Sequence, residues 1–197
     1  MCGLFGFDGV AAPDPTKLRV VAEAASRRGP HACGVAWDSE GAVQVERRAG
    51  PWRTHAAELL RACSSAIRIV GHFRLSTSGN WRDLANNQPL HFGGCAVAHN
   101  GNIQGWRERA ERLGLKLTTS CDSELVARVL DASREFAPIA LNEAGLANIP
   151  HAVLALRTNA FFATRRMLPL FAWITPEGTY YSSVQPHTDA LPLPEPI

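Results

Sequence analysis

The sequence lacks any apolar run that approaches the roughly 18–20 residues needed to span a bilayer. Its first residues also lack the basic segment of a secretory signal, and Asp8 interrupts their apolar stretch. Charge is nearly balanced, at 20 basic against 18 acidic residues, which gives no electrostatic reason to expect a nucleic acid or an anionic membrane as partner. We therefore expect a cytoplasmic protein that binds neither.

The cysteines follow no pattern of disulfide bonds or metal ligands that would stabilise a small fold. Their number is odd and no C-x-x-C pair occurs, so neither a disulfide framework nor a zinc knuckle is expected. His91, Cys95 and His99 recur every four residues, a spacing that would bring them together only on a helix, whereas Gly93-Gly94 favours a strand. We expect no metal and no other cofactor. The five cysteines are Cys2, Cys33, Cys63, Cys95 and Cys121.

The composition is that of one globular domain. Hydrophobic residues make up 46% and charged residues 19% of the 197 residues. Periodicity and turn signals predict strands at 2–7, at both sides of the DSEG turn in 34–50, and at 67–79, 93–103, 152–159, 169–178 and 179–184. Predicted helices are 13–29, with Asp14 as its cap, 54–66, 103–114 and 121–136. Proline-rich residues 185–197 are predicted to form an extended, poorly ordered tail.

Strands group with strands and helices with helices in this order. That arrangement favours an α+β fold with antiparallel sheets over alternating βαβ units. Two sheets packed face to face, with helices outside, would suit strands that carry apolar residues on one face and polar ones on the other. The segment 67–76 is the clearest case, with Ile69 and Phe73 on one face and His72 and Arg74 on the other.

Cys2 is a candidate nucleophile because of its position. A thiol has an ordinary pKa of about 8.5 and needs a base beside it to attack at neutral pH. If Met1 is removed, the α-amine of Cys2 has a reference pKa of about 7.7–8.0 and can take the proton itself. A buried cysteine that only packs is the common alternative.

Asn100 and Gly101, in AHNGN, allow two interpretations. Asn-Gly is the strongest short hairpin signal, which predicts a type I′ turn. The segment that follows is predicted to be helical, so the pair would instead end a strand at an exposed and rigid point. An amide and a backbone N–H there are the donors that a tetrahedral oxyanion needs.

Arg74 and Asp122 also have a structural and a functional interpretation each. Arg74 is either a solvated arginine on a strand face or a guanidinium that binds a substrate carboxylate, with Thr77 and Ser78 adding hydroxyl groups in the next loop. Asp122 is either the N-cap of the helix it precedes or a carboxylate that holds a substrate ammonium group.

Taken in order, five segments resemble the class II glutamine amidotransferase domain, the N-terminal-nucleophile glutaminase. These segments are MCGLFG, RRGPHACG, GHFRLSTSG, the pair NQPL and AHNG, and SCDSE, and the resemblance covers residues 2–184. No single one is specific, but their joint order and spacing are hard to obtain by chance. The resemblance implies a four-layer αββα sandwich, one domain over 2–184 and a tail over 185–197.

The resemblance also implies an activity. Cys2 would attack the side-chain amide of L-glutamine with its own α-amine as base, ammonia would leave, and water would hydrolyse the γ-glutamyl thioester. A separate synthase subunit is the expected user of the ammonia. The implied roles are Cys2 as nucleophile, Asn100 and Gly101 as the oxyanion hole, Arg74 for the α-carboxylate, Asp122 for the α-amino group, and Leu75, Thr77 and Ser78 in the substrate pocket.

The chain departs from the family pattern at three positions. His31 stands where many members have Asp, Ser78 where some have histidine or glycine, and Leu75 where an aromatic residue is frequent. His31 resembles the branch that includes hydrolases of other γ-glutamyl amides, and it is equally compatible with a structural role at the helix exit. A hydrolase of another γ-glutamyl amide and an inactive regulatory or binding module therefore remain alternatives.

Overall fold

The computed structural model describes residues 1–76, 80–133 and 138–196. Within them, a seven-stranded antiparallel sheet has the order β11-β9-β10-β1-β4-β2-β3. A second, four-stranded antiparallel sheet has the order β5-β6-β7-β8. The strands of the first are β1 (Gly3–Gly9), β2 (Ala32–Ser39), β3 (Ala42–Ala49), β4 (Arg68–Arg74), β9 (Phe171–Thr175), β10 (Gly178–Ser182) and β11 (Leu191–Pro192). Those of the second are β5 (Leu90–Phe92), β6 (Cys95–Gly101), β7 (His151–Arg157) and β8 (Ala160–Arg166).

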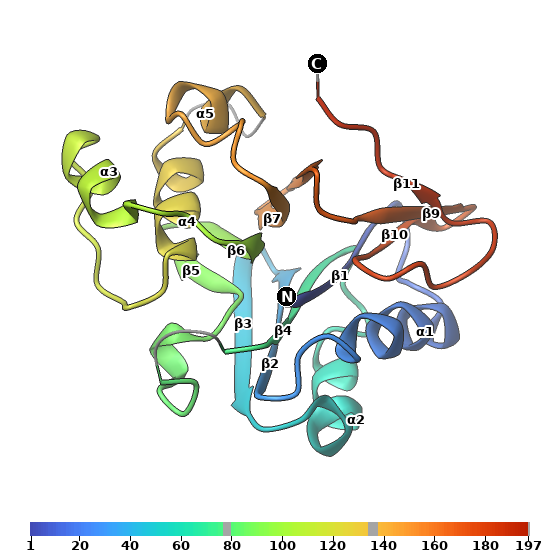
Figure 1. Cartoon of the computed structure of the whole chain (residues 1–197). Coiled ribbons are helices and arrows are strands. Elements are labelled where there is room, and N and C mark those ends of the chain that lie inside the picture. Colours follow the sequence, from blue (N-terminus) through green and yellow to red (C-terminus); the bar gives the residue numbers. More distant parts are fainter. Residues whose placement is uncertain (77–79, 134–137, 197) are drawn as a thin grey trace.

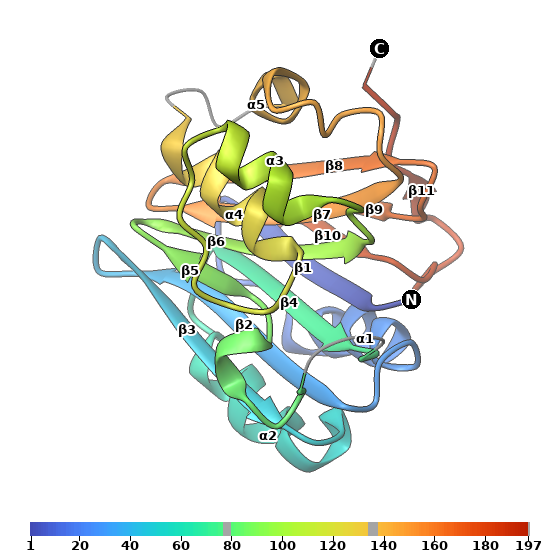
Figure 2. The ribbon, with the colours of Figure 1, turned by 60° about the vertical axis from the view of Figure 1, so that its left-hand side comes forward.

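Helices cover the outer face of each sheet, as Figures 1 and 2 show. One outer layer is α1 (Pro15–Ser26) and α2 (Trp52–Ala62), and the other is α3 (Trp106–Arg112), α4 (Ser123–Ala132) and α5 (Pro138–Glu143). A short 3₁₀ helix, η1 (Leu84–Asn86), precedes β5. The order helix, sheet, sheet, helix confirms the predicted αββα sandwich. No helix in the described ranges is long and apolar enough to cross a bilayer.

Three apolar clusters hold the four layers together. One lies between α1, α2 and the first sheet, with Phe5 and Phe73 stacked at 5.3 Å between ring centroids. Another lies between α4 and the second sheet. The third lies between the two sheets, where Leu4, Val70 and Leu154 are fully buried. Removing this apolar surface from water is the main driving force for the sandwich.

The middle strands of the first sheet are buried on both faces. Ile69 and Phe73 of β4 face the helices, as the alternation predicts, while Val70 contributes to the cluster between the sheets. His72 and Arg74 are also buried, at 0% and 6% exposure. A solvated position for Arg74 is therefore excluded.

Several predicted helices and strands are confirmed with shifted ends. Asp14 caps α1, accepting hydrogen bonds from the backbone N–H groups of Thr16 and Lys17. The DSEG turn joins β2 to β3, as predicted. Strands β5 and β8 were not predicted. The tight turn before β8 depends on Asn159, whose φ of 66° is one that asparagine tolerates better than most residues.

The prediction of a poorly ordered tail was wrong. Leu191 and Pro192 form β11, which pairs with β9 at the edge of the first sheet. The N–H of Leu193 then donates to Leu170 O at 2.8 Å, and Glu195 forms an ion pair with Arg165 of β8 at 3.4 Å. Proline is tolerated on an edge strand because its missing N–H faces away from the ladder.

Candidate active site

Cys2 lies at the start of β1, at the end of the sandwich where β4 and β6 finish. The next residue, Gly3, fixes this entry, because a Cβ atom there would lie 2.1 Å from Ala25 O of α1. Only glycine allows the helix to pack this closely on the strand. Gly3 therefore allows β1 to pack closely against α1, and the Cys2 thiol lies at the end of the sheet where β1 begins.

Two contacts join Cys2 to other predicted site residues. Its backbone N–H donates to Asn100 Oδ1 at 3.0 Å, and its Sγ lies 3.7 Å from Leu75 O. Asn100 is 2% exposed. Since its Oδ1 is turned to Cys2, the orientation of its amide is fixed. Its Nδ2 has no hydrogen-bond partner among the described residues, so a buried donor is held beside the thiol.

The Asn100-Gly101 pair is not a turn, and it does not lie at an exposed end. Both residues belong to β6 and pair with Ala152 and His151 of β7. The hairpin signal is overridden because the segment continues an apolar strand that the second sheet buries. A Cβ atom at Gly101 would lie 2.3 Å from His99 Nε2, so a side chain there is excluded by the neighbouring ring.

Arg74 ends β4, next to Leu75. Its NH1 donates to Asn86 O at 2.7 Å and to Asn87 Oδ1 at 2.8 Å. The Asn87 amide in turn donates to Trp81 O at 2.7 Å. These hydrogen bonds orient the guanidinium in a buried position.

Asp122 occupies the cap position of α4 but does not cap the helix. Among the described residues its carboxylate accepts no capping hydrogen bond from the first turn; Oδ1 accepts the Ser123 hydroxyl at 3.5 Å and Oδ2 accepts the N–H of Ile103 at 2.8 Å. This contact links the start of α4 to the segment after β6. Asp122 therefore occupies the predicted N-cap position without making a side-chain capping bond, and its carboxylate contacts the segment that follows Asn100 and Gly101.

The structure thus brings Cys2, Leu75, Arg74, Asn100, Gly101 and Asp122 to one end of the sandwich. Arg74 and Asp122 both lie close enough to the Cys2 thiol to shift its pKa, Arg74 downward and Asp122 upward. Burial raises the pKa of Cys2 above its ordinary value, and the Leu75 carbonyl contact and Arg74 only partly oppose this. The thiol is therefore neutral at pH 7 and needs a base. Thr77 and Ser78 lie outside the described residues.

Two residues that hold this set in place are His31, which the sequence singled out, and Arg28, which it did not. The N–H of Ser76 donates to His31 Nδ1 at 2.9 Å, the N–H of His31 donates to Arg74 O at 3.0 Å, and the His31 ring stacks on Trp81 at 5.8 Å. His31 therefore binds the segment that follows β4. Arg28, whose NH1 donates to Ser183 O at 2.9 Å, lies near enough for the Cys2 thiol to affect its pKa. The contacts of His31 agree with the structural interpretation that the sequence left open.

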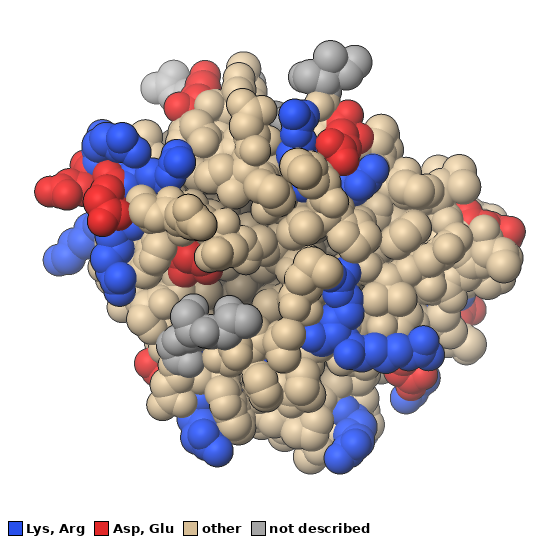
Figure 3. Space-filling view, viewed as in Figure 1, with Lys and Arg blue, Asp and Glu red and all other residues tan. Residues whose placement is uncertain are grey.

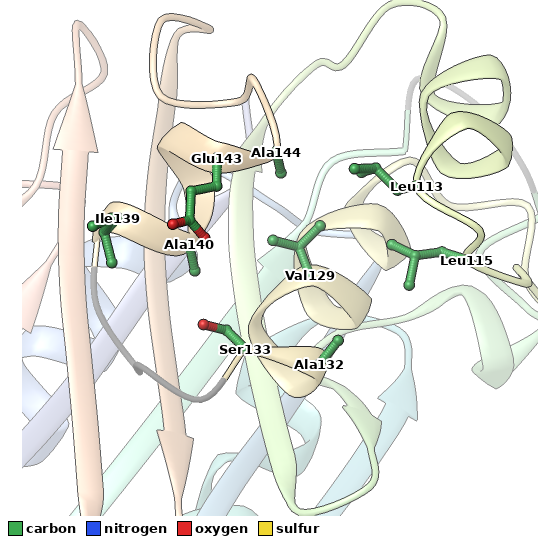
Figure 4. Close-up of a pocket in the computed structure, with 9 residues that line it drawn as sticks. All are labelled: Leu113, Leu115, Val129, Ala132, Ser133, Ile139, Ala140, Glu143 and Ala144. Carbon is green, nitrogen blue, oxygen red and sulfur yellow. The ribbon is translucent and has the colours of Figure 1, made fainter.

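Two further features of the molecule are the charge on its surface and a groove between helices. Blue and red side chains are interspersed on the face in Figure 3, with no large area of one sign. A groove of about 490 Å³ lies between α3, α4 and α5, where Leu113 and Leu115 face Val129 across it (Figure 4). No predicted site residue lines that groove. Over the described ranges, no three His, Cys, Asp or Glu side chains are grouped as a metal site.

Comparisons with known proteins agree with this geometry. No family model matches the chain. It is 31% identical over 140 residues to the glutamine–fructose-6-phosphate aminotransferase [isomerizing] of Corynebacterium glutamicum, and 31% identical over 139 residues to that of Chlamydia trachomatis. Each match covers 66% of this chain but only 22% of the relative. The chain therefore corresponds to about a fifth of these proteins.

Solved structures of similar fold include larger and smaller proteins. The glutamine phosphoribosylpyrophosphate amidotransferase of B. subtilis superposes with a TM-score of 0.72 at 20% identity, over 92% of this chain and 42% of that one. A glutamine aminotransferase class-II domain protein from Silicibacter pomeroyi has a TM-score of 0.66 at 16% identity, over 98% of this chain and 92% of that one. At such identities the likeness concerns the fold alone.

Proposed function

Because the chain belongs to the class II glutamine amidotransferase domain family, we propose that it hydrolyses L-glutamine to glutamate and ammonia through Cys2. The observation that carries this proposal is the pairing of the Cys2 nitrogen with Asn100 Oδ1, while the buried Asn100 Nδ2 finds no partner in the part of the chain that the structure describes. A buried donor without a partner is costly in a folded protein, and a substrate oxygen that accepts its hydrogen bond would remove that cost.

The first step is attack of the thiol on the side-chain amide carbon. After removal of Met1, the α-amine of Cys2 takes the thiol proton as the sulfur–carbon bond forms. The carbonyl oxygen becomes an oxyanion, to which Asn100 Nδ2 and the Gly101 N–H donate. Asn100 Oδ1 accepts a hydrogen bond from the amine. This contact keeps the lone pair of the amine nitrogen near the thiol.

The second step releases ammonia and leaves a γ-glutamyl thioester. The protonated amine gives its proton to the departing nitrogen, and water then attacks the thioester, returning Cys2 as a thiol. Arg74 binds the α-carboxylate of the substrate and Asp122 its α-ammonium group, so the two charges at one end of glutamine meet two opposite charges. Leu75, Thr77 and Ser78 complete the pocket in this proposal.

We further propose that the ammonia is used by a synthase on a separate polypeptide. The curated relatives are named as aminotransferases, and the segment they share with this chain is 22% of their length. Glutaminase activity should then be low for the chain alone and should rise when the synthase and its acceptor are added. Equal activity with and without a genuine partner would contradict this.

One observation favours a second substrate class. His31 stands where many members have Asp and binds the segment from Arg74 to Ser76, so the pocket wall differs from theirs. A hydrolase of another γ-glutamyl amide is therefore the alternative. A panel of L-glutamine, γ-glutamyl ethylamide and γ-glutamyl anilide at equal concentration decides between them, since the proposal requires that kcat/KM is highest for glutamine.

The five cysteines are free in the structure, which suits a reducing compartment. We propose a cytoplasmic location on this ground. Fractionation of cells that express the full chain at its natural level, followed by immunodetection, tests it.

A further inference from the structure

Asn86 is not one of the residues to which the proposed reaction assigns a role, yet it contacts Arg74 and also Ser120, close in sequence to Asp122. It lies at the end of η1 and is 4% exposed. Its backbone oxygen accepts the Arg74 guanidinium at 2.7 Å. Its side-chain Oδ1 accepts both the N–H of Ser120, at 2.9 Å, and the Ser120 hydroxyl, at 2.8 Å.

Ser120 leads directly to the other charged residue of the pocket. It lies two positions before Asp122, whose Oδ2 accepts the N–H of Ile103 at 2.8 Å. Ile103 follows Asn100 and Gly101, and Asn100 binds the Cys2 nitrogen. Hydrogen bonds therefore join Arg74 to Asn86 and Asn86 to Ser120, and the chain itself leads from Ser120 to Asp122 two positions on.

The orientation of the Asn86 amide is itself fixed. Its Nδ2 donates to Asp83 Oδ2 at 2.9 Å, and its N–H donates to Asp83 O at 3.1 Å. Asp83 Oδ1 is occupied by the N–H of Ala85 at 3.0 Å. Since Asp83 holds the nitrogen end of the amide, the oxygen end is presented to Ser120 and cannot turn away without losing three hydrogen bonds.

From these contacts we propose that Asn86 is a positioning residue that sets the distance between Arg74 and Asp122, and with it the fit of a free α-amino acid head. The inference rests on the proposed function, which assigns the carboxylate to Arg74 and the ammonium to Asp122. Asn86 does not touch the thiol or the reacting amide. Its loss should therefore weaken binding of the substrate head and leave the chemistry at Cys2 largely intact.

The main test is Asn86→Ala, compared with Asn142→Ala as a control on the exposed side of α5. For glutamine hydrolysis, Asn86→Ala should raise KM at least tenfold while kcat stays within about threefold, the pattern of a lost binding contact. The control should change neither. An unchanged KM in a folded Asn86→Ala protein overturns the proposal.

A second readout separates a positioning role from collapse of the site. Cys2 is alkylated either by iodoacetamide, which has no amino acid head, or by 6-diazo-5-oxo-L-norleucine, a diazoketone shaped like glutamine. Asn86→Ala should lower the second-order rate for the diazoketone about tenfold and leave that for iodoacetamide within twofold. An equal fall in both rates contradicts the proposal, because a general distortion would then explain it.

An exchanged pair keeps the test decisive if Asn86→Ala does not fold. The double variant Asp83→Asn with Asn86→Asp keeps two acceptor contacts to Ser120 and swaps donor and acceptor in the link between positions 83 and 86. Its KM should lie within threefold of wild type, whereas Asn86→Asp alone places two carboxylates together and should raise KM tenfold. Equal KM values for the single and double variants overturn the proposal.

Failure of the proposed function is distinguishable from failure of this inference. Iodoacetamide measures the general reactivity of the Cys2 thiol. If the wild-type rate with the diazoketone shows no enhancement beyond that general reactivity, no amino acid head is bound and the proposed function fails. If wild type shows the preference and Asn86→Ala keeps it in full, only the role of Asn86 fails.

Discussion

Strand β4 carries an arginine at each end, and the two have different partners. Arg68 forms ion pairs with Asp8, at 3.3 Å, and with Asp38, at 3.0 Å. Arg74 donates to the carbonyl of Asn86 and the amide oxygen of Asn87. The antiparallel register of β1 and β4 places Arg68 opposite Asp8 and brings Arg74 to the Cys2 end of the sandwich.

The difference separates a structural end from a functional end of one fold. The carboxylates of Asp8 and Asp38 balance the charge of Arg68, so this end of β4 needs no charged ligand from outside the chain. Oxygens of Asn86 and Asn87 orient the Arg74 guanidinium at the Cys2 end, where a planar guanidinium suits a site that binds a carboxylate. The same contrast extends to the second sheet, where Asn100 lies at the Cys2 end and Asn159 in the turn at the other end.

The largest effect is expected at these two asparagines. Asn100→Ala removes a donor to the oxyanion and should lower kcat for glutamine hydrolysis about 10²–10³-fold, the usual loss for one such donor. Asn159→Ala, at the opposite end of the sheet, should leave kcat within twofold. Steady-state kinetics of both variants test this. Similar losses of kcat in the two would contradict the assignment of one structural and one functional end.

The two arginines give the next effect. Arg74→Lys keeps the charge but loses the planar fork, and should raise KM for glutamine about 30–100-fold, equivalent to roughly 2–3 kcal/mol. Arg68→Lys should leave KM within twofold and lower the free energy of unfolding by about 1 kcal/mol. Kinetics and urea unfolding of both variants are needed. A larger rise in KM for Arg68→Lys than for Arg74→Lys would reverse the assignment.

Between the two arginines, β4 buries His72 in the layer between the sheets. Burial, assisted by Arg74, lowers the pKa of His72 to about 3, and burial lowers the pKa of His99 to about 4. The unfolded chain titrates near 6.5, so these groups stabilise the fold above that pH and lose this contribution as pH falls. Each should cost about 2 kcal/mol between pH 7 and pH 5.

Urea unfolding at the two pH values measures this loss. His72→Gln should make the difference between pH 7 and pH 5 smaller by about 2 kcal/mol. An identical pH dependence in wild type and His72→Gln would show that His72 is not kept neutral by the fold.

The smallest effect is expected at the contact between hairpin turns far from Cys2. Thr158 Oγ1 donates to Gly41 O at 3.2 Å and so joins the β7–β8 turn to the β2–β3 turn. Thr158→Val should lower the free energy of unfolding by at most about 1 kcal/mol, because the contact is exposed. Glutaminase activity should not change. Thermal unfolding and a kinetic assay are sufficient, and a loss of activity above twofold would link this end to the site.

Sequence reasoning predicted the fold well because its signals are local and repeated. The cap at Asp14 and the DSEG turn each depend on residues adjacent in the chain, and both are confirmed. Asn100-Gly101 is a case in which a local signal was overridden by the strand ladder with β7. The edge strands β5, β8 and β11 were not predicted, because their formation depends on pairing with a neighbouring strand.

The site was predictable only as a set of side chains. The motifs indicated Cys2, Arg74, Asn100 and Asp122, and the structure brings these residues to one end of the sandwich. The contacts that hold them, such as Asn86 to Ser120, join residues 34 apart and leave no periodic signal. The buried position of Arg74 was equally invisible, since it depends on the second sheet covering the first.

The most direct measurement is glutamate release from L-glutamine by the purified chain, beside Cys2→Ala, with the intact mass of each protein. We predict that the active protein begins at Cys2 and that Cys2→Ala abolishes glutamate release while the protein stays folded. Release that survives Cys2→Ala, or full activity in a protein that retains Met1, would contradict a mechanism in which the Cys2 thiol attacks and its own amine is the base.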